Sequence, residues 1–143
     1  MRASEDNTAA LNAQEALIYA MITAAASDRT ISREELARIG TMVRELPALA
    51  DVEETWLSNE AQSCGKVLKR PDGVNAVVRM IASALDQPLR ETAYALAAEV
   101  AASDLAIKDD ERSFLSLLAT GLEIDPLMRV TLDRAAQVRH RRI

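Results

Sequence analysis

The sequence repeats one short segment at a fixed distance along the chain. The run Ala-Ala-Ser-Asp ends at Asp28 and again at Asp104, and a glutamate follows seven residues later in each case, at Glu35 and Glu111. The offset is constant, since 104 − 28 and 111 − 35 both equal 76. Apolar stretches with helical spacing flank both copies. Such a repeat indicates two similar supersecondary units that share one core.

The composition favours helices in both units. Of the 143 residues, 49% are apolar and only 3% are aromatic. The apolar residues are mostly Ala, Leu, Val, Ile and Met, a mixture that suits helices better than strands. We therefore expect an all-α protein of about seven helices, with two related helical halves in one domain over residues 8–138. Residues 1–7 and 139–143 are expected to be flexible ends.

Apolar periodicity and capping signals predict where the helices begin and end. We expect four helices over about residues 8–27, 32–46, 51–69 and 74–85. A fifth helix begins at about residue 87, a sixth contains residues 114–122, and a seventh runs from residue 126 past 138. The expected N-caps are Thr8, Ser32, Asp51, Asp86 and Asp125. The clearest is Ser32, because Glu35 stands three residues later and completes a capping box. The first helix should bury one face only, with Ile18 and Met21 on it.

The two corners between helices carry acids that could hold a cation. If the halves pack about a pseudo-two-fold axis, the repeated acids converge, and hard divalent ions such as Ca²⁺ or Mg²⁺ take oxygen ligands of this kind. The primary candidate ligands are Asp28, Glu35, Asp104 and Glu111, with Glu34, Asp109 and Asp110 as further candidates. The sequence therefore predicts a divalent-cation site at the paired corners.

The same acids also have a purely structural interpretation. Glu35 belongs to a capping box, and aspartates at corners brace turns through their own backbone. Acids in the first turn of a helix stabilise it through the helix dipole, which accounts for the run from Asp109 to Glu111. The ion site and the structural role both stay open on the sequence alone.

The sequence contains few of the residue arrangements that most classes of enzyme active site require. His140 is the only histidine and Cys64 the only cysteine, so Ser-His-Asp and Cys-His arrangements have little material. The sequence also has no glycine-rich phosphate loop and no Cys/His zinc spacing. We expect a non-enzymatic protein, and paired carboxylates acting as acid and base remain the low-weight alternative.

Charge and cysteine content narrow the partners and the compartment. The net charge is −5, and the acidic body disfavours nucleic-acid binding. A single cysteine fits a reducing cytoplasm, and no apolar stretch approaches the ~18 residues of a membrane span. Protein partners are compatible with an acidic helical module. Trp56, the sole tryptophan, either plugs the core or anchors an interface.

The two corners resemble a motif of the TerB tellurite-resistance family, an Ala-x-Asp-Gly-x-Ile/Val-x-x-x-Glu pattern used twice. The matching runs are Ser-Asp-Arg-Thr-Ile-Ser-Arg-Glu-Glu at 27–35 and Ser-Asp-Leu-Ala-Ile-Lys-Asp-Asp-Glu at 103–111. The segments 85–88 and 124–126 add to the likeness, which covers about residues 10–130. The family glycine is replaced by Arg29 and Leu105. This departure bears on any ion site that needs the family's backbone shape, because glycine enters the left-handed region freely and leucine does not.

The resemblance implies an all-helical fold of two related halves and a role in bacterial resistance to tellurite and other stresses. It also implies divalent-cation binding through acidic residues and work beside membrane-bound partners. It implies no enzymatic activity. The expected function is therefore a cytoplasmic TerB-like stress protein that binds a cation, docks to partners, or does both. The alternative is a helical adaptor with no metal site.

Overall fold

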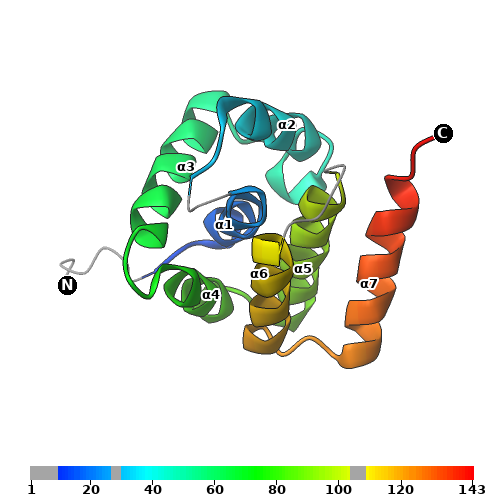
Figure 1. The fold of residues 1–143 in the computed structure, drawn as a ribbon. Helices are drawn as coiled ribbons and strands as arrows, with labels where there is room; N and C mark the ends of the chain where they lie inside the picture. Colours follow the sequence, from blue (N-terminus) through cyan, green and yellow to red (C-terminus); the bar gives the residue numbers. More distant parts are fainter. Residues whose placement is uncertain (1–9, 27–29, 104–108) are drawn as a thin grey trace.

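The computed structural model of the chain describes residues 10–26, 30–103 and 109–143. Over these ranges the chain forms seven α-helices and one short 3-10 helix, η1, with no strand (Figure 1). The helices are α1 (Ala13–Ala25), α2 (Arg33–Val43), η1 (Pro47–Leu49), α3 (Glu54–Leu68), α4 (Gly73–Ala84), α5 (Gln87–Ala102), α6 (Asp109–Gly121) and α7 (Pro126–Arg139). The prediction of an all-α fold of about seven helices is confirmed.

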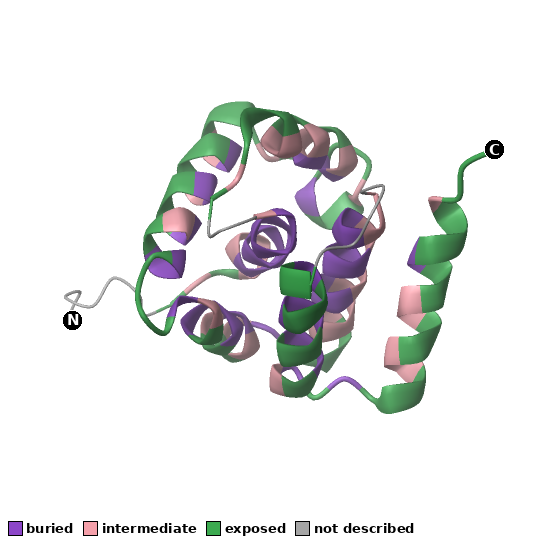
Figure 2. Ribbon diagram, in the orientation of Figure 1, coloured by how far each residue is buried: buried purple, intermediate pink, exposed green. Residues whose placement is uncertain are grey.

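Helix α1 lies at the centre of the molecule, and α2, α3, α4, α5 and α6 pack around it (Figure 1). Every residue from Ala16 to Ala25 is buried, so α1 has no solvent face in this stretch (Figure 2). The expectation of a single buried face on this helix was wrong. Its residues are apolar on all sides apart from the hydroxyls of Tyr19 and Thr23, and a helix of that kind is stable only when it is surrounded.

The sequence repeat appears as a repeat of helices. Shifting α1 by 76 positions gives residues 89–101, which lie inside α5, and shifting α2 gives 109–119, which lie inside α6. The two equivalent helices α1 and α5 pack against one another. Small residues such as Ala93, Ala97 and Ala101 are fully buried in α5, which allows the close approach. The sequence repeat therefore falls on corresponding helices, and these helices contribute to one core.

Three of the five expected N-caps are found at the predicted residues. Ser32 caps α2, the side chain of Asp86 accepts from the backbone N–H of Leu89, and Asp125 caps α7. These signals are local, because a side-chain oxygen reaches backbone groups only two or three residues away.

The first helix begins later than expected. Thr8 lies outside the described residues, but residues 10–12 are not helical and Asn12 caps α1. The Asn12 side chain accepts from the N–H of Glu15, and the Glu15 carboxylate accepts from the N–H of Asn12, both at 2.8 Å. This capping box stops the helix from extending back to Thr8.

The connection from α2 to α3 also differs from the expectation. Helix α2 ends at Val43 because Leu46 precedes a proline and adopts an extended conformation. Helix α3 begins at Glu54, not after Asp51, whose carboxylate accepts a hydrogen bond from the Gln14 side chain at 3.0 Å. The 3-10 turn between them buries Leu49 completely. A long-range contact and a buried leucine thus delay the start of α3.

Across the described ranges, every helix is too short or too polar to cross a lipid bilayer.

Candidate functional site

The first corner leads into α2 through a capping box. Glu35 donates its backbone N–H to Ser32 Oγ at 3.0 Å, and Glu35 Oε1 accepts from the backbone N–H of Ser32 at the same distance. The neighbouring acid, Glu34, is exposed in the first turn. Glu35 is therefore anchored by a local structural role, as the capping interpretation predicted, and its position at the start of α2 is fixed.

We expect Ser32→Ala to lower the free energy of unfolding by about 1 kcal/mol, because one helix-terminal N–H loses its partner. Urea unfolding followed by circular dichroism measures the change. Ser58→Ala is the matched control, since Ser58 is an exposed serine inside α3. A Ser32→Ala variant as stable as the control would show that the cap contributes nothing.

The second corner leads into α6 and gives its glutamate a different environment. Glu111 is the repeat counterpart of Glu35, yet its residue is only 2% exposed and it has an interaction partner in the folded chain. Lys108 occupies the sequence position that corresponds to Ser32, so the capping box of the first corner is not repeated. Asp109 and Asp110 beside it are exposed. Of the two equivalent glutamates, Glu35 is a half-buried member of a capping box, whereas Glu111 places its carboxyl group inside the protein.

A cavity of about 310 Å³ lies between described residues that flank the two corners. Ala26, the last described residue before the first corner, lines this cavity together with Asp110, which comes just after the second. Phe114 and Leu117 of α6 supply much of its apolar wall. The described residues that flank the two bends therefore meet at one cavity.

The predicted ligand set is only partly placed. Asp28 and Asp104 lie outside the described residues, as do Arg29 and Leu105 beside them. Among the residues that are described, no group of three or more His, Cys, Asp or Glu side chains is arranged to hold a metal ion. A cluster of three or more such side chains at the corners would therefore have to include Asp28 or Asp104.

Cys64 lies in the core and has the environment of a structural residue. Its side chain is fully buried on α3 and lies 3.5 Å from Thr23 Oγ1 of α1. Burial raises the pKa of the thiol to about 12, although the Thr23 contact opposes the shift. A thiol in this state is protonated at neutral pH and is a poor nucleophile.

Cys64 should make stability depend on alkaline pH. The unfolded thiol ionises near 9.0 and the folded one near 12, so its stabilising contribution is complete below pH 9 and is lost as pH rises towards 12. We expect the stability difference between wild type and Cys64→Ala to shift by about 1 kcal/mol per pH unit above 9. Urea unfolding at pH 7, 9 and 10 tests this. A difference that is constant with pH would contradict it.

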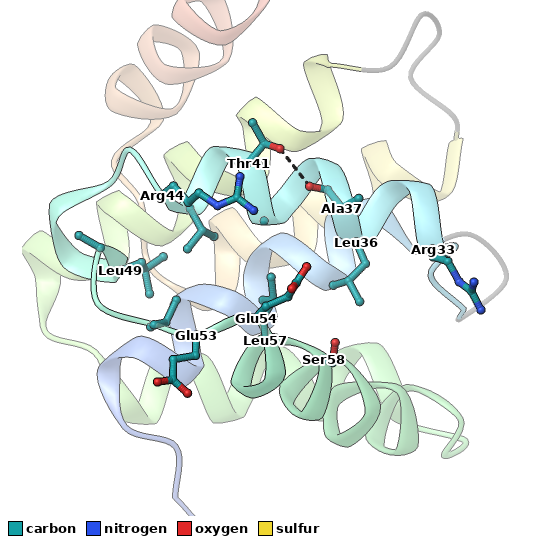
Figure 3. A pocket seen from close by; sticks show the side chains of 14 residues that line it. Arg33, Leu36, Ala37, Thr41, Arg44, Leu49, Glu53, Glu54, Leu57 and Ser58 are labelled. Atoms are coloured by element: carbon teal, nitrogen blue, oxygen red, sulfur yellow. Dashed lines mark hydrogen bonds between the residues drawn. The ribbon is translucent and has the colours of Figure 1, made fainter.

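A second hollow, of about 330 Å³, lies between α2, η1 and α3 (Figure 3). Its apolar lining includes Leu36, Leu49 and Leu57, while Arg44 and Glu54 are charged residues of opposite sign beside it. We call this hollow the α2–α3 groove. Trp56 is not among its lining residues and is instead packed, partly buried, against the core.

The sequence did not predict the polar contacts that hold α7 against α5. Tyr94 Oη donates to Asp133 Oδ1 at 2.7 Å, and Glu99 lies 3.2 Å from the Arg139 guanidinium and 2.7 Å from His140 Nε2. The segment expected to be a free end is therefore attached at its first two residues. Each contact joins residues about 40 positions apart, so no local pattern announces it.

Comparison with known proteins gives one match. The model of a family described as "Protein of unknown function (DUF533)" matches residues 2–136, which is nearly the whole chain. No curated protein matches the chain, and no solved structure does.

Proposed function

This chain belongs to the DUF533 family, whose description is of proteins of unknown function, and from that premise we propose that it is a TerB-like bacterial stress protein. It is non-enzymatic and works in the cytoplasm, the compartment that suits a chain with a single buried thiol. It acts by holding a divalent cation, Ca²⁺ or Mg²⁺, where its two corners meet. Partner proteins, some of them membrane-bound, respond to the loaded form.

The observation that supports this proposal is the cavity that Ala26 and Asp110 both line. Ala26 lies two residues before Asp28 in the sequence and Asp110 lies six residues after Asp104, and we infer that the repeated acids act together beside this cavity. Glu111 adds a carboxyl group in the interior, and Asp28 and Asp104 are the repeat aspartates of the two corners. Oxygen ligands from both corners suit a hard cation, which takes six to eight of them in the case of Ca²⁺.

Calorimetric titration of chelator-treated protein with Ca²⁺, Mg²⁺, Mn²⁺ and Zn²⁺ tests the proposal. We expect one of these ions to bind with a Kd below about 1 mM. The double variant Asp28→Asn/Asp104→Asn should weaken binding by at least about tenfold. The matched control Glu45→Gln/Glu54→Gln removes two exposed carboxylates elsewhere and should bind as wild type does. Failure of every ion to bind, or equal binding by both double variants, would contradict the cation site.

The second candidate is a helical adaptor with no metal, and the α2–α3 groove favours it. The groove offers apolar contacts from Leu36 and Leu57 with charges of both signs around them, which suits a short amphipathic segment of a partner. In this reading Glu35 serves only as the capping partner of Ser32.

A photo-reactive amino acid at Thr41, which lines the groove, tests the adaptor. We expect it to cross-link a defined partner protein in bacterial cells. The same group at Thr120, which is exposed on α6, should give no such product. Equal cross-linking from the two positions, or none from Thr41, would remove the groove from consideration.

A further inference from the structure

Helix α7 presents apolar side chains to solvent along one line. It packs on the outside of α5 at the edge of the molecule (Figure 1). Leu127, Val130 and Val138 are 74%, 63% and 47% exposed. Leu127, Arg134 and Val138 are spaced by seven and four residues, so they lie on the same face of the helix, with Val130 next to them. This outward stripe is continuous over the whole of α7, whose outer side is exposed in Figure 2.

The polar contacts of α7 fix this stripe outward. The inward side carries Leu132 and the buried Ala136. Asp133 is held by Tyr94 near the middle of the helix, and Glu99 holds Arg139 at its end. Because two separated points attach the helix to α5, rolling it to hide its apolar side chains would break the partly buried Tyr94–Asp133 hydrogen bond and the Arg139–Glu99 ion pair.

The C-terminal segment that carries the stripe is basic, in contrast to the rest of the protein. Residues 126–143 carry five arginines and one aspartate, a charge of +4, so the other 125 residues carry −9 of the total −5. The single aspartate, Asp133, faces α5 and is bonded there. Arg134, Arg141 and Arg142 are all exposed. The outward side of α7 therefore combines apolar groups with Arg134, and Arg141 and Arg142 add two exposed cations directly after the helix.

We propose that the outward face of α7 docks on an anionic lipid surface. A short helix with a few exposed apolar side chains and several arginines suits the plane of a membrane interface, where the apolar groups enter the headgroup region and the arginines meet lipid phosphates. Each arginine near such a surface strengthens binding by roughly fivefold. The apolar area is small, so binding is reversible and depends on charge. This surface binding is independent of the proposed cation site.

The charge distribution favours a membrane over a second copy of this chain. A symmetric dimer through α7 would bring two copies of the same basic segment together, and like charges at an interface are unfavourable. On a membrane, by contrast, only α7 meets the negative surface. Much of the acidic body then lies more than the ~10 Å screening length of 0.1 M salt away from it.

Flotation of the full chain with lipid vesicles tests the proposal. We expect binding to vesicles of 70% phosphatidylcholine and 30% phosphatidylglycerol at 0.1 M salt, loss of binding at 1 M salt, and no binding to pure phosphatidylcholine. Arg134→Gln/Arg141→Gln/Arg142→Gln should lower the partition coefficient at least about tenfold. Leu127→Ser/Val130→Ser/Val138→Ser should lower it as well, since charge alone is not sufficient.

The charge-matched control is Arg44→Gln/Lys66→Gln/Lys69→Gln, which removes three exposed cations from other helices and should float as wild type does. Circular dichroism checks that each variant is folded. Equal flotation of the two triple-glutamine variants, binding to both kinds of vesicle, or no flotation of the wild type would overturn the proposal. If the wild-type protein does not bind vesicles but dimerises through α7 in sedimentation equilibrium, the outward face of α7 is an interface with a second copy of the chain instead.

Discussion

Replacing Leu17 by Ala is expected to lower the free energy of unfolding by about 2–5 kcal/mol. Leu17 is only 1% exposed and lies in α1, which is buried on every side. Because α1 is packed between other helices on all sides, these helices cannot easily move in to fill the cavity that the deleted side chain leaves. The loss is a large part of the 5–15 kcal/mol that a domain of this kind usually has. Urea unfolding measures it directly.

The matched control for this prediction is Leu127→Ala on α7. Leu127 is 74% exposed, so its truncation should change the stability by no more than about 0.5 kcal/mol. The comparison keeps the chemistry of the substitution constant and varies only the burial. Similar effects from the two variants would mean that α1 is not the centre of the core.

Local signals account for most of what the sequence could predict about the fold. Ser32 with Glu35, Asp86 and Asp125 each fix a helix start through atoms two or three residues away, and the sequence contains all of that information. The short segment repeated at an offset of 76 residues also predicted that the two halves of the chain are related. The predictions of helix starts were wrong where contacts between distant parts of the chain determine the local structure. Asp51 does not cap a helix, because Gln14 from α1 takes its carboxylate.

The candidate site shows the same division. The capping box at Glu35 was predictable, because the spacing of Ser32 and Glu35 is local information. The burial of Glu111 was not, because its sequence position is equivalent to that of Glu35 and only the surrounding helices make the two different. The attachment of Arg139 and His140 to Glu99 was missed for a related reason. A basic run looks like a solvated end until the partner on another helix is known.

Replacing Gly73 by Ala is expected to destabilise the protein by about 3 kcal/mol. Gly73 begins α4 directly against the end of α3, and it is buried. A Cβ atom at this position would lie 2.6 Å from the carbonyl carbon of Leu68 and 2.8 Å from its Cα, and it would also clash with the carbonyl oxygen. These are backbone atoms, so no side-chain rotation can relieve the contact. The α3–α4 junction must shift instead, and with it the packing of both helices on α1.

Gly65→Ala provides the opposite result from the same substitution. Gly65 lies inside α3, and an added Cβ would meet nothing within 4 Å. Because glycine is the less favourable residue in a helix interior, this variant should be more stable than wild type by about 0.5–1 kcal/mol. Thermal and urea unfolding of both variants give the two signs directly. If Gly73→Ala were neutral or stabilising, the close junction between α3 and α4 would be wrong, and the packing of α4 beside the shared cavity would need to be redrawn with it.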